Sequence, residues 1–135
     1  QAADLVGRKL AMGADGKGGG VVARLIADMR SEAQGASLVA LIDACEAVAA
    51  HLLAADADDR LAGSYPFLTM LSVAVCGWLM EKQARAAGDD DFGKAKRAVA
   101  HFYGAQIVPE AMGLKAAAMA SADVLYALSA EALAQ

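Results

Sequence analysis

The sequence is poor in cysteine, proline and aromatic residues, with two Cys, two Pro, one Trp, three Tyr and three Phe in 135 residues. Two cysteines cannot build the disulfide framework of a small secreted domain, which favours a cytoplasmic protein. Cys45 and Cys76 both lie in apolar helical patterns, where a free cysteine behaves as a small hydrophobic residue. We therefore expect no disulfide bond.

The chain also lacks long runs of charge of one sign, and its formal net charge is −4. Nucleic-acid binding requires clustered Lys and Arg, so we expect no nucleic-acid partner. The short run Asp89–Asp91 lacks the ligand spacing of a hard-cation site and predicts a solvated loop that caps the next helix. The most apolar stretch, residues 67–80, is shorter than the ~20 residues of a membrane crossing. We expect neither a membrane span nor a secretory signal.

Apolar residues are abundant instead, at 58% of the chain, and many of them are alanine, the strongest helix former. Glycine and proline cluster near residues 13–20, 63–66 and 88, with long alanine-rich stretches between them. This layout predicts an all-α protein: an antiparallel four-helix bundle with a short leading helical segment and a short C-terminal helical tail. The main helices are expected over residues 21–34, 37–55, 64–87 and from about 92 to 119.

Local signals refine these helices. Ser37 and Ser64 are predicted N-caps, and Pro66 fits the first turn of its helix. Pro109 is expected to kink the last helix without ending it, because the periodicity continues on both sides. The small side chains of that helix predict a narrow seam against the central helix, formed by Ala95, Ala98, Phe102, Ala105, Pro109, Met112, Ala116 and Met119.

Trp78 follows Gly77 on the central helix, whose first half is apolar nearly all round. We expect this tryptophan in the core, so that its replacement by alanine lowers the melting temperature sharply. The alternative is that Trp78 belongs to an exposed docking surface for another domain.

Residues that could carry chemistry are scattered. His51 and His101 have no second ligand three or four positions away, so zinc and di-iron spacings are missing. Ser64 and Ser72 have no evident base for nucleophilic catalysis. The glycine-rich residues 13–20 lack the Gly-Lys-Ser/Thr ending of a phosphate-binding loop and are predicted to be a connector. Five residues could together line a polar groove, although an ordinary interface between helices is favoured. They are Arg97, His101, Tyr103, Tyr65 and Trp78.

Two stretches resemble a known family. Asp4-Leu-Val-Gly-Arg-Lys-Leu10 resembles the segment that follows the turn bearing the catalytic glutamate in a bacterial branch of acyl-CoA dehydrogenases. A second stretch resembles the acetyl-CoA dehydrogenase-like C-terminal domain of 3-methylmercaptopropionyl-CoA dehydrogenase-like proteins. It comprises Tyr65-Pro-Phe-Leu, Gly77-Trp78-Leu79, and Phe92-Gly-Lys-Ala-Lys96 through His101-Phe102-Tyr103 to Pro109.

The resemblance implies three parts: residues 1–12 as the end of the last helix of a dehydrogenase core, 13–20 as a glycine-rich connector and 21–135 as an appended helical bundle. The connector is longer and richer in glycine than the family pattern. The parent enzyme would be an FAD-dependent oxidoreductase of fatty acid metabolism that dehydrogenates an acyl-CoA thioester at its α,β-bond. Its catalytic glutamate and flavin domain would precede Gln1, so this chain alone is expected to be inactive. Only Gln1 is carried over, as a cofactor-binding residue near the flavin.

The expected role is structural or docking, with no catalytic or metal-binding residues within the chain. Its partners would be the dehydrogenase core of its own chain and further copies in a homo-oligomer, with acyl-CoA as the substrate of the parent. The alternative is a free-standing helical interaction or oligomerisation module without catalytic activity.

Overall fold

The computed structural model describes residues 1–13 and 20–134, and every regular element in those ranges is helical. The predicted all-α class is confirmed. Most of the predicted connector, residues 14–19, lies outside the described residues. The elements, in chain order, are α1 (Ala2–Asp4), the π-helical turn η1 (Leu5–Lys9), α2 (Val21–Glu32), α3 (Ala36–Ala54), α4 (Ala57–Ala62), α5 (Ser64–Ala86), α6 (Asp91–Phe102), the π-helical turn η2 (Tyr103–Ile107), α7 (Val108–Met112), α8 (Lys115–Ala118), the 3₁₀ turn η3 (Ala122–Val124) and α9 (Ala130–Leu133).

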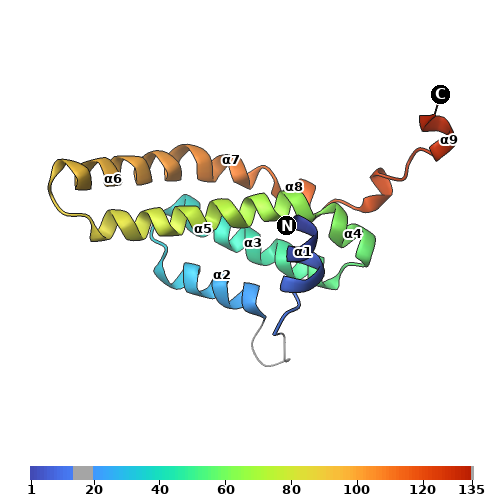
Figure 1. Ribbon diagram of the computed structural model, residues 1–135, viewed down its shortest axis with the longest axis horizontal. Coiled ribbons are helices and arrows are strands. Elements are labelled where there is room, and N and C mark those ends of the chain that lie inside the picture. The colour runs from blue at the N-terminus through green and yellow to red at the C-terminus, as the bar shows by residue number, and fades with distance from the viewer. Residues whose placement is uncertain (14–19, 135) are drawn as a thin grey trace.

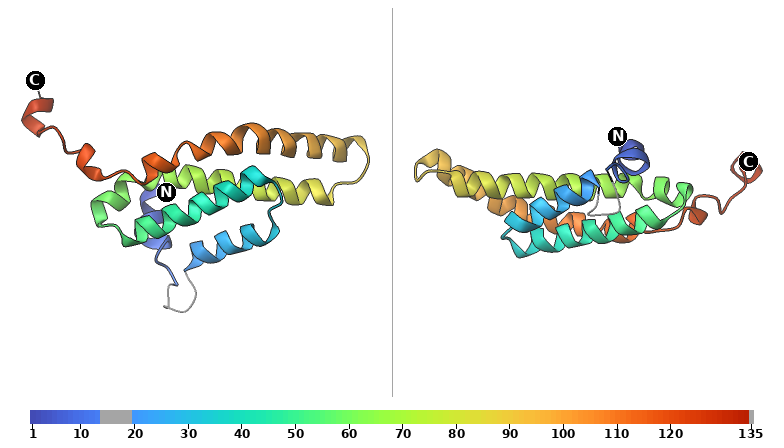
Figure 2. Two further views of the ribbon diagram at one scale, coloured as in Figure 1. Left: turned by 180° about the vertical axis from the view of Figure 1, so that it is seen from behind. Right: turned by 90° about the horizontal axis from the view of Figure 1, so that it is seen from below.

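The longest helix, α5, runs through the middle of the molecule (Figure 1). Helices α6 and α7 follow one side of α5, α2 lies on the other, and α3 packs against α5 from behind (Figure 2). The far end of α5 and the start of α6 project beyond α2 and α3 as a hairpin, and the C-terminal tail leaves at the opposite end. A regular four-helix bundle is therefore not established.

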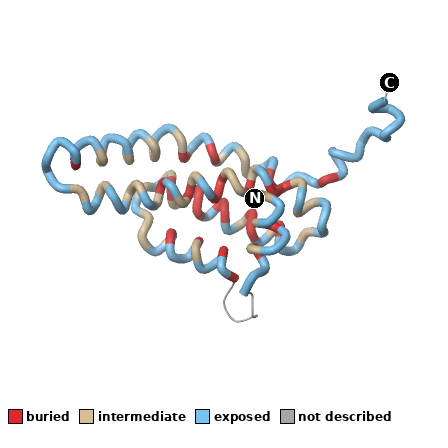
Figure 3. The backbone as a smooth tube through the Cα atoms, viewed as in Figure 1, coloured by how far each residue is buried: buried red, intermediate tan, exposed pale blue. Residues whose placement is uncertain are grey.

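Much of the core is built from the apolar positions of α3, the second of the predicted long helices. Leu41, Ile42, Val48 and Leu52 of α3 are completely buried, and Figure 3 shows this buried face running along the centre of the molecule. Fully burying one such side chain stabilises a fold by about 1.5–3 kcal/mol. By length and composition alone α3 could cross a membrane. Core helices of soluble proteins pass the same test, so the expected absence of a membrane span stays a prediction.

The two predicted serine caps are wrong. A capping side chain belongs to the residue just before the first turn of a helix, and in both helices that residue is a glycine. Ser37 lies inside α3, where its Oγ donates to the carbonyl oxygen of Gly104 at 2.9 Å. Ser64 is buried in the first turn of α5. The predicted capping loop is confirmed, because the Asp90 carboxylate accepts the N–H of Gly93 at 2.8 Å.

The predicted seam of the last helix is also wrong. The π-helical turn η2 precedes Pro109, so the helix changes its winding there, as a proline that lacks its N–H and crowds the preceding turn requires. The mismatch begins before that turn, since Ala95, Ala98 and Phe102 of α6 are already exposed. Beyond it, the extra residue of the π-helical turn shifts the face further, and Val108, Ala111 and Ala118 are buried. The exposed members of the predicted seam are Ala95, Ala98, Phe102, Ala105, Pro109 and Ala116.

Trp78 lies at the edge of the core and is only half-buried. Its Nε1 donates to Glu32 Oε2 at 2.8 Å, and Lys82 Nζ lies 4.7 Å from the ring centroid. An indole has a polar N–H that needs a partner, which favours this edge position over the centre. The predicted core position of Trp78 is therefore wrong, because Trp78 lies at the edge of the core and joins the end of α2 to α5. The fully buried aromatic residue is Phe67.

The contact of Glu32 with Trp78 and Lys82 is expected to weaken at acid pH. Hydrogen bonds from Lys82 and then Trp78 lower the pKa of Glu32 from its ordinary value of 4.5. A carboxyl with a lowered folded-state pKa stabilises the fold above the unfolded pKa and loses that effect as pH falls through the lower value. The fluorescence of Trp78, the one tryptophan, should therefore change on acidification with a midpoint below pH 4.5. Glu32→Gln should remove that transition; a wild-type midpoint at or above 4.5 would contradict the assignment.

Candidate functional site

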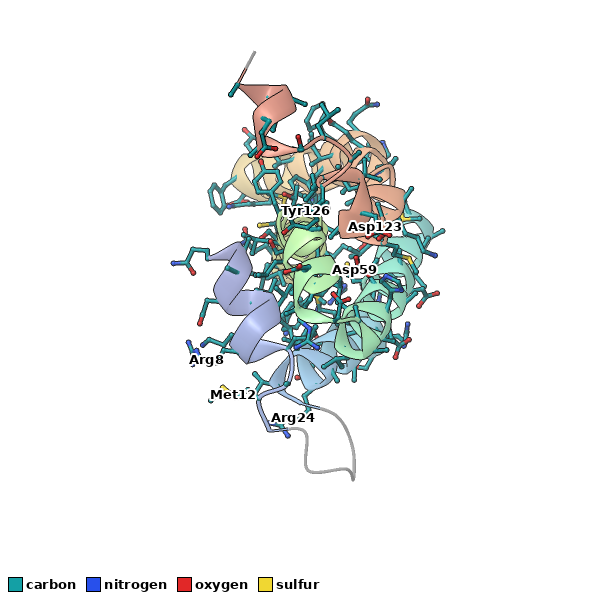
Figure 4. The ribbon with its side chains drawn as sticks, turned by 90° about the vertical axis from the view of Figure 1, so that its right-hand side faces the viewer. Arg8, Met12, Arg24, Asp59, Asp123 and Tyr126 are labelled. Atoms are coloured by element: carbon teal, nitrogen blue, oxygen red, sulfur yellow. The ribbon has the colours of Figure 1, made fainter. Side chains whose placement is uncertain are left out.

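The leading segment is built into the bundle. Val6 and Leu10 are 0% and 2% exposed, covered by α4 and α5. The N–H of Val21 donates to the carbonyl oxygen of Met12 at 2.9 Å, so the segment is tied to the start of α2. Gly20 permits this approach, because a Cβ there would lie 2.6 Å from the same oxygen. Figure 4 shows Met12 beside this junction and Arg8 pointing outward.

Gln1, the predicted flavin-proximal residue, is exposed at the start of α1. It lies beside the exposed Ala3 and Asp4, and it does not line the groove between α5 and α6. One exposed amide without a surrounding cavity does not fit an isoalloxazine ring, which needs an enclosed, mostly apolar site. The placement of Gln1 near a flavin stays a prediction, and the rest of any such site would have to come from outside the described residues.

A groove of about 450 Å³ lies between α5, α6 and the α2–α3 loop. Arg97 and His101, two residues of the conceivable polar groove, line it together. The other three do not join them: Tyr103 packs against the core, Tyr65 is exposed near the start of α5, and Trp78 faces α2. Of the five residues that the sequence suggested for a polar groove, two therefore line this one.

Glu81 is the residue of this groove that the sequence did not reveal. Its carboxylate accepts the N–H of Gln34 at 2.9 Å and that of Gly35 at 3.0 Å. These amides belong to the loop between α2 and α3, just before the first turn of α3, so Glu81 pairs backbone donors that have no helical partner there. Arg85 lies 3.7 Å away as an additional partner. The contact spans 46 residues of sequence, and no local pattern marks it.

Arg97 holds the other end of the groove. Its guanidinium donates to the carbonyl oxygens of Ala87 and Gly88 at 3.2 and 3.0 Å, which closes the loop between α5 and α6. Such bonds satisfy carbonyl groups that the end of α5 leaves unpaired. The polar groups of the groove thus mainly hold backbone in place: Glu81 fastens α3 to α5, and Arg97 fastens α5 to α6.

Groups that could perform chemistry stay apart. Within residues 1–13 and 20–134, no three His, Cys, Asp or Glu side chains come close enough to hold a metal ion. His51 lies on α3 and His101 on α6. Burial raises the pKa of the Cys45 thiol to about 12, which leaves it protonated and unreactive at neutral pH. The exposed Cys76 is also free.

Comparison with known proteins gives one family. The model described as "Acetyl-CoA dehydrogenase C-terminal like" matches residues 20–129. That range runs from the start of α2 into the tail, and includes the groove and the α5–α6 hairpin. No curated protein and no solved structure gives a significant match to the chain.

Proposed function

We propose, from the premise that this chain belongs to the acetyl-CoA dehydrogenase C-terminal-like family, that its helices serve a structural docking role in an FAD-dependent acyl-CoA dehydrogenase. The parent would be a cytoplasmic homo-oligomer that dehydrogenates an acyl-CoA thioester of fatty acid metabolism. When bound in that parent, FAD would accept the hydride from the substrate. The residues around Gln1 do not form a flavin site, so we assign no step of the reaction to this chain.

The observation that carries this proposal is the burial of Val6 and Leu10. Both residues precede the matched range, which begins at residue 20, yet they belong to the same core as α3 and α5. If residues 1–12 end the last helix of the dehydrogenase core, that helix and the bundle cannot move independently without exposing both side chains. The bundle would then brace the helix that follows the catalytic glutamate.

The proposal is tested by removing the bundle from the full-length enzyme. We compare the complete gene product with a version that ends before residue 20, and we measure flavin absorbance, acyl-CoA oxidation and the melting temperature of both. The complete protein should be yellow and active. The shortened one should melt at a lower temperature, because Val6 and Leu10 lose their cover.

Two outcomes would contradict the proposal. The first is a shortened enzyme with an unchanged melting temperature, and the second is flavin retained by the 135-residue chain alone. A gene without a dehydrogenase core upstream of residue 1 would favour the alternative of a free-standing interaction module.

A further inference from the structure

The outer face of the α5–α6 hairpin forms an apolar groove of about 220 Å³. Met80 of α5 and Phe92 and Val99 of α6 line it. Phe92 is 70% exposed and Val99 53%. Leu79 and Phe102 are also exposed on the same two helices. Exposed apolar side chains on two neighbouring helices, next to an apolar groove, are typical of an interaction surface.

The spacing on α6 is that of a helix contact. Phe92, Ala95, Val99 and Phe102 recur at steps of three and four, which places them on one face of the helix. All four are exposed. A groove between two antiparallel helices with such a face accepts a third helix, which would cover both walls.

The C-terminal tail, residues 121–134, is a second apolar element, and no other part of the described chain covers its large apolar side chains. The carboxylate of Asp59 accepts the N–H of Ala122 at 2.6 Å and the hydroxyl of Ser121 at 3.2 Å, which holds the start of the tail against α4. Figure 4 shows Asp59 close to this part of the tail, near Asp123. Beyond this anchor every large apolar side chain is at least 61% exposed, namely Val124, Leu125, Tyr126, Leu128 and Leu133.

On a helix, Val124, Leu125, Leu128 and Ala132 form one apolar stripe, because they lie at i, i+1, i+4 and i+8. Such a stripe is the anchor pattern of a helix that binds in a groove. The part from Ala130 to Leu133 is already helical, with the hydroxyl of Ser129 as its cap. The tail is therefore suited to dock as a helix.

The two elements lie at opposite ends of an elongated molecule (Figures 1 and 2). Two copies that lie side by side in opposite directions bring each tail to the hairpin of the other. We propose that the tail of one copy docks as a helix in the α5–α6 groove of a second copy, and that both tails are exchanged in a two-fold dimer. Such an arrangement closes on itself and leaves no unpaired tail.

Charge supports this occupant. The charged residues of the tail, Asp123 and Glu131, are both acidic. The charged residue that lines the groove is Lys96, whose Nζ binds the neutral Gln83 at 3.0 Å and lies 5.3 Å from the ring centroid of Phe92. Glu131 follows Leu128 by three positions and so borders the apolar stripe, where it can pair with Lys96 of the other copy.

The first test measures the mass of the 135-residue chain by sedimentation equilibrium. We expect a dimer for the wild type and a monomer for Leu125→Asp/Leu128→Asp, with an unchanged melting temperature in the dilute monomeric range because the tail adds nothing to the core. Tyr126→Ser is the matched control: Tyr126 is as exposed as Leu125, at 67% against 68%, but lies on the other side of the stripe and should leave the dimer intact. Val99→Asp in the groove should abolish it.

The second test reverses the charges. Lys96→Glu and Glu131→Lys should each raise the dissociation constant of the dimer roughly three- to tenfold, and the two together should restore it. A wild-type monomer would overturn the proposal, whether the tail folds back on its own hairpin or stays free. A dimer that the tail and groove variants leave unchanged would also overturn it.

Discussion

Replacing Phe67 with alanine is expected to lower the free energy of unfolding by about 3–5 kcal/mol. Phe67 is completely buried in α5, among the side chains that join α5 to α3. Removing the ring leaves a cavity that the long helices around it cannot close without moving as units. The loss is a large share of the ~5–15 kcal/mol that stabilises an ordinary domain. Chemical denaturation followed by circular dichroism measures it.

Tyr65→Ala is the matched control for this substitution, since Tyr65 lies on the same helix and is 73% exposed. Its replacement should change the free energy of unfolding by no more than about 0.5 kcal/mol. Trp78→Ala should fall between the two variants, because Trp78 is half-buried and held at the edge of the core by Glu32. Equal losses in Phe67→Ala and Tyr65→Ala would show that the core is not centred on α5.

Replacing Leu10 with alanine is expected to cost about 2–5 kcal/mol, the range of buried leucines. Leu10 is 2% exposed, although it precedes the matched family range. Arg8→Ala is the control within the same segment, because the Arg8 guanidinium pairs at 2.7 Å with the exposed carboxylate of Asp4. Exposed pairs of this kind contribute little to stability, because solvent screens them. If both variants unfold alike, the leading segment is not part of the folded unit.

Local periodicity was enough to predict the long helices and much of the core. The buried positions of α3, such as Leu41, Val48 and Leu52, follow from their spacing because α3 is one uninterrupted helix. The buried face of the last predicted helix could not be predicted from its spacing in the same way. Small residues lie on both faces of α6, so the spacing alone selected Ala95 and Ala98, which are exposed, over the side of the helix that carries the buried Gly93. Beyond α6, the π-helical turn from Tyr103 to Ile107 changes the winding, so a seam extended across it at α-helical steps does not follow the buried face.

The groove could be predicted only where its residues are neighbours in sequence. Arg97 and His101 share it because they are four positions apart on α6, which puts them on one face of a helix. The bonds from Glu81 to the loop just before α3 join residues that no sequence pattern relates. Tyr65 could not be placed correctly for a related reason: it lies near the opposite end of the same long helix that carries Glu81.

The central claim is that the bundle braces the catalytic part of an acyl-CoA dehydrogenase through the leading segment. It is tested most directly by the temperature at which the full-length enzyme releases its flavin, followed by flavin fluorescence, in Leu10→Ala and Arg8→Ala variants. We predict that Leu10→Ala lowers this temperature together with the melting temperature of the bundle, while Arg8→Ala changes neither. Flavin release at the wild-type temperature, despite a less stable bundle, would contradict the claim and make the bundle an independent module.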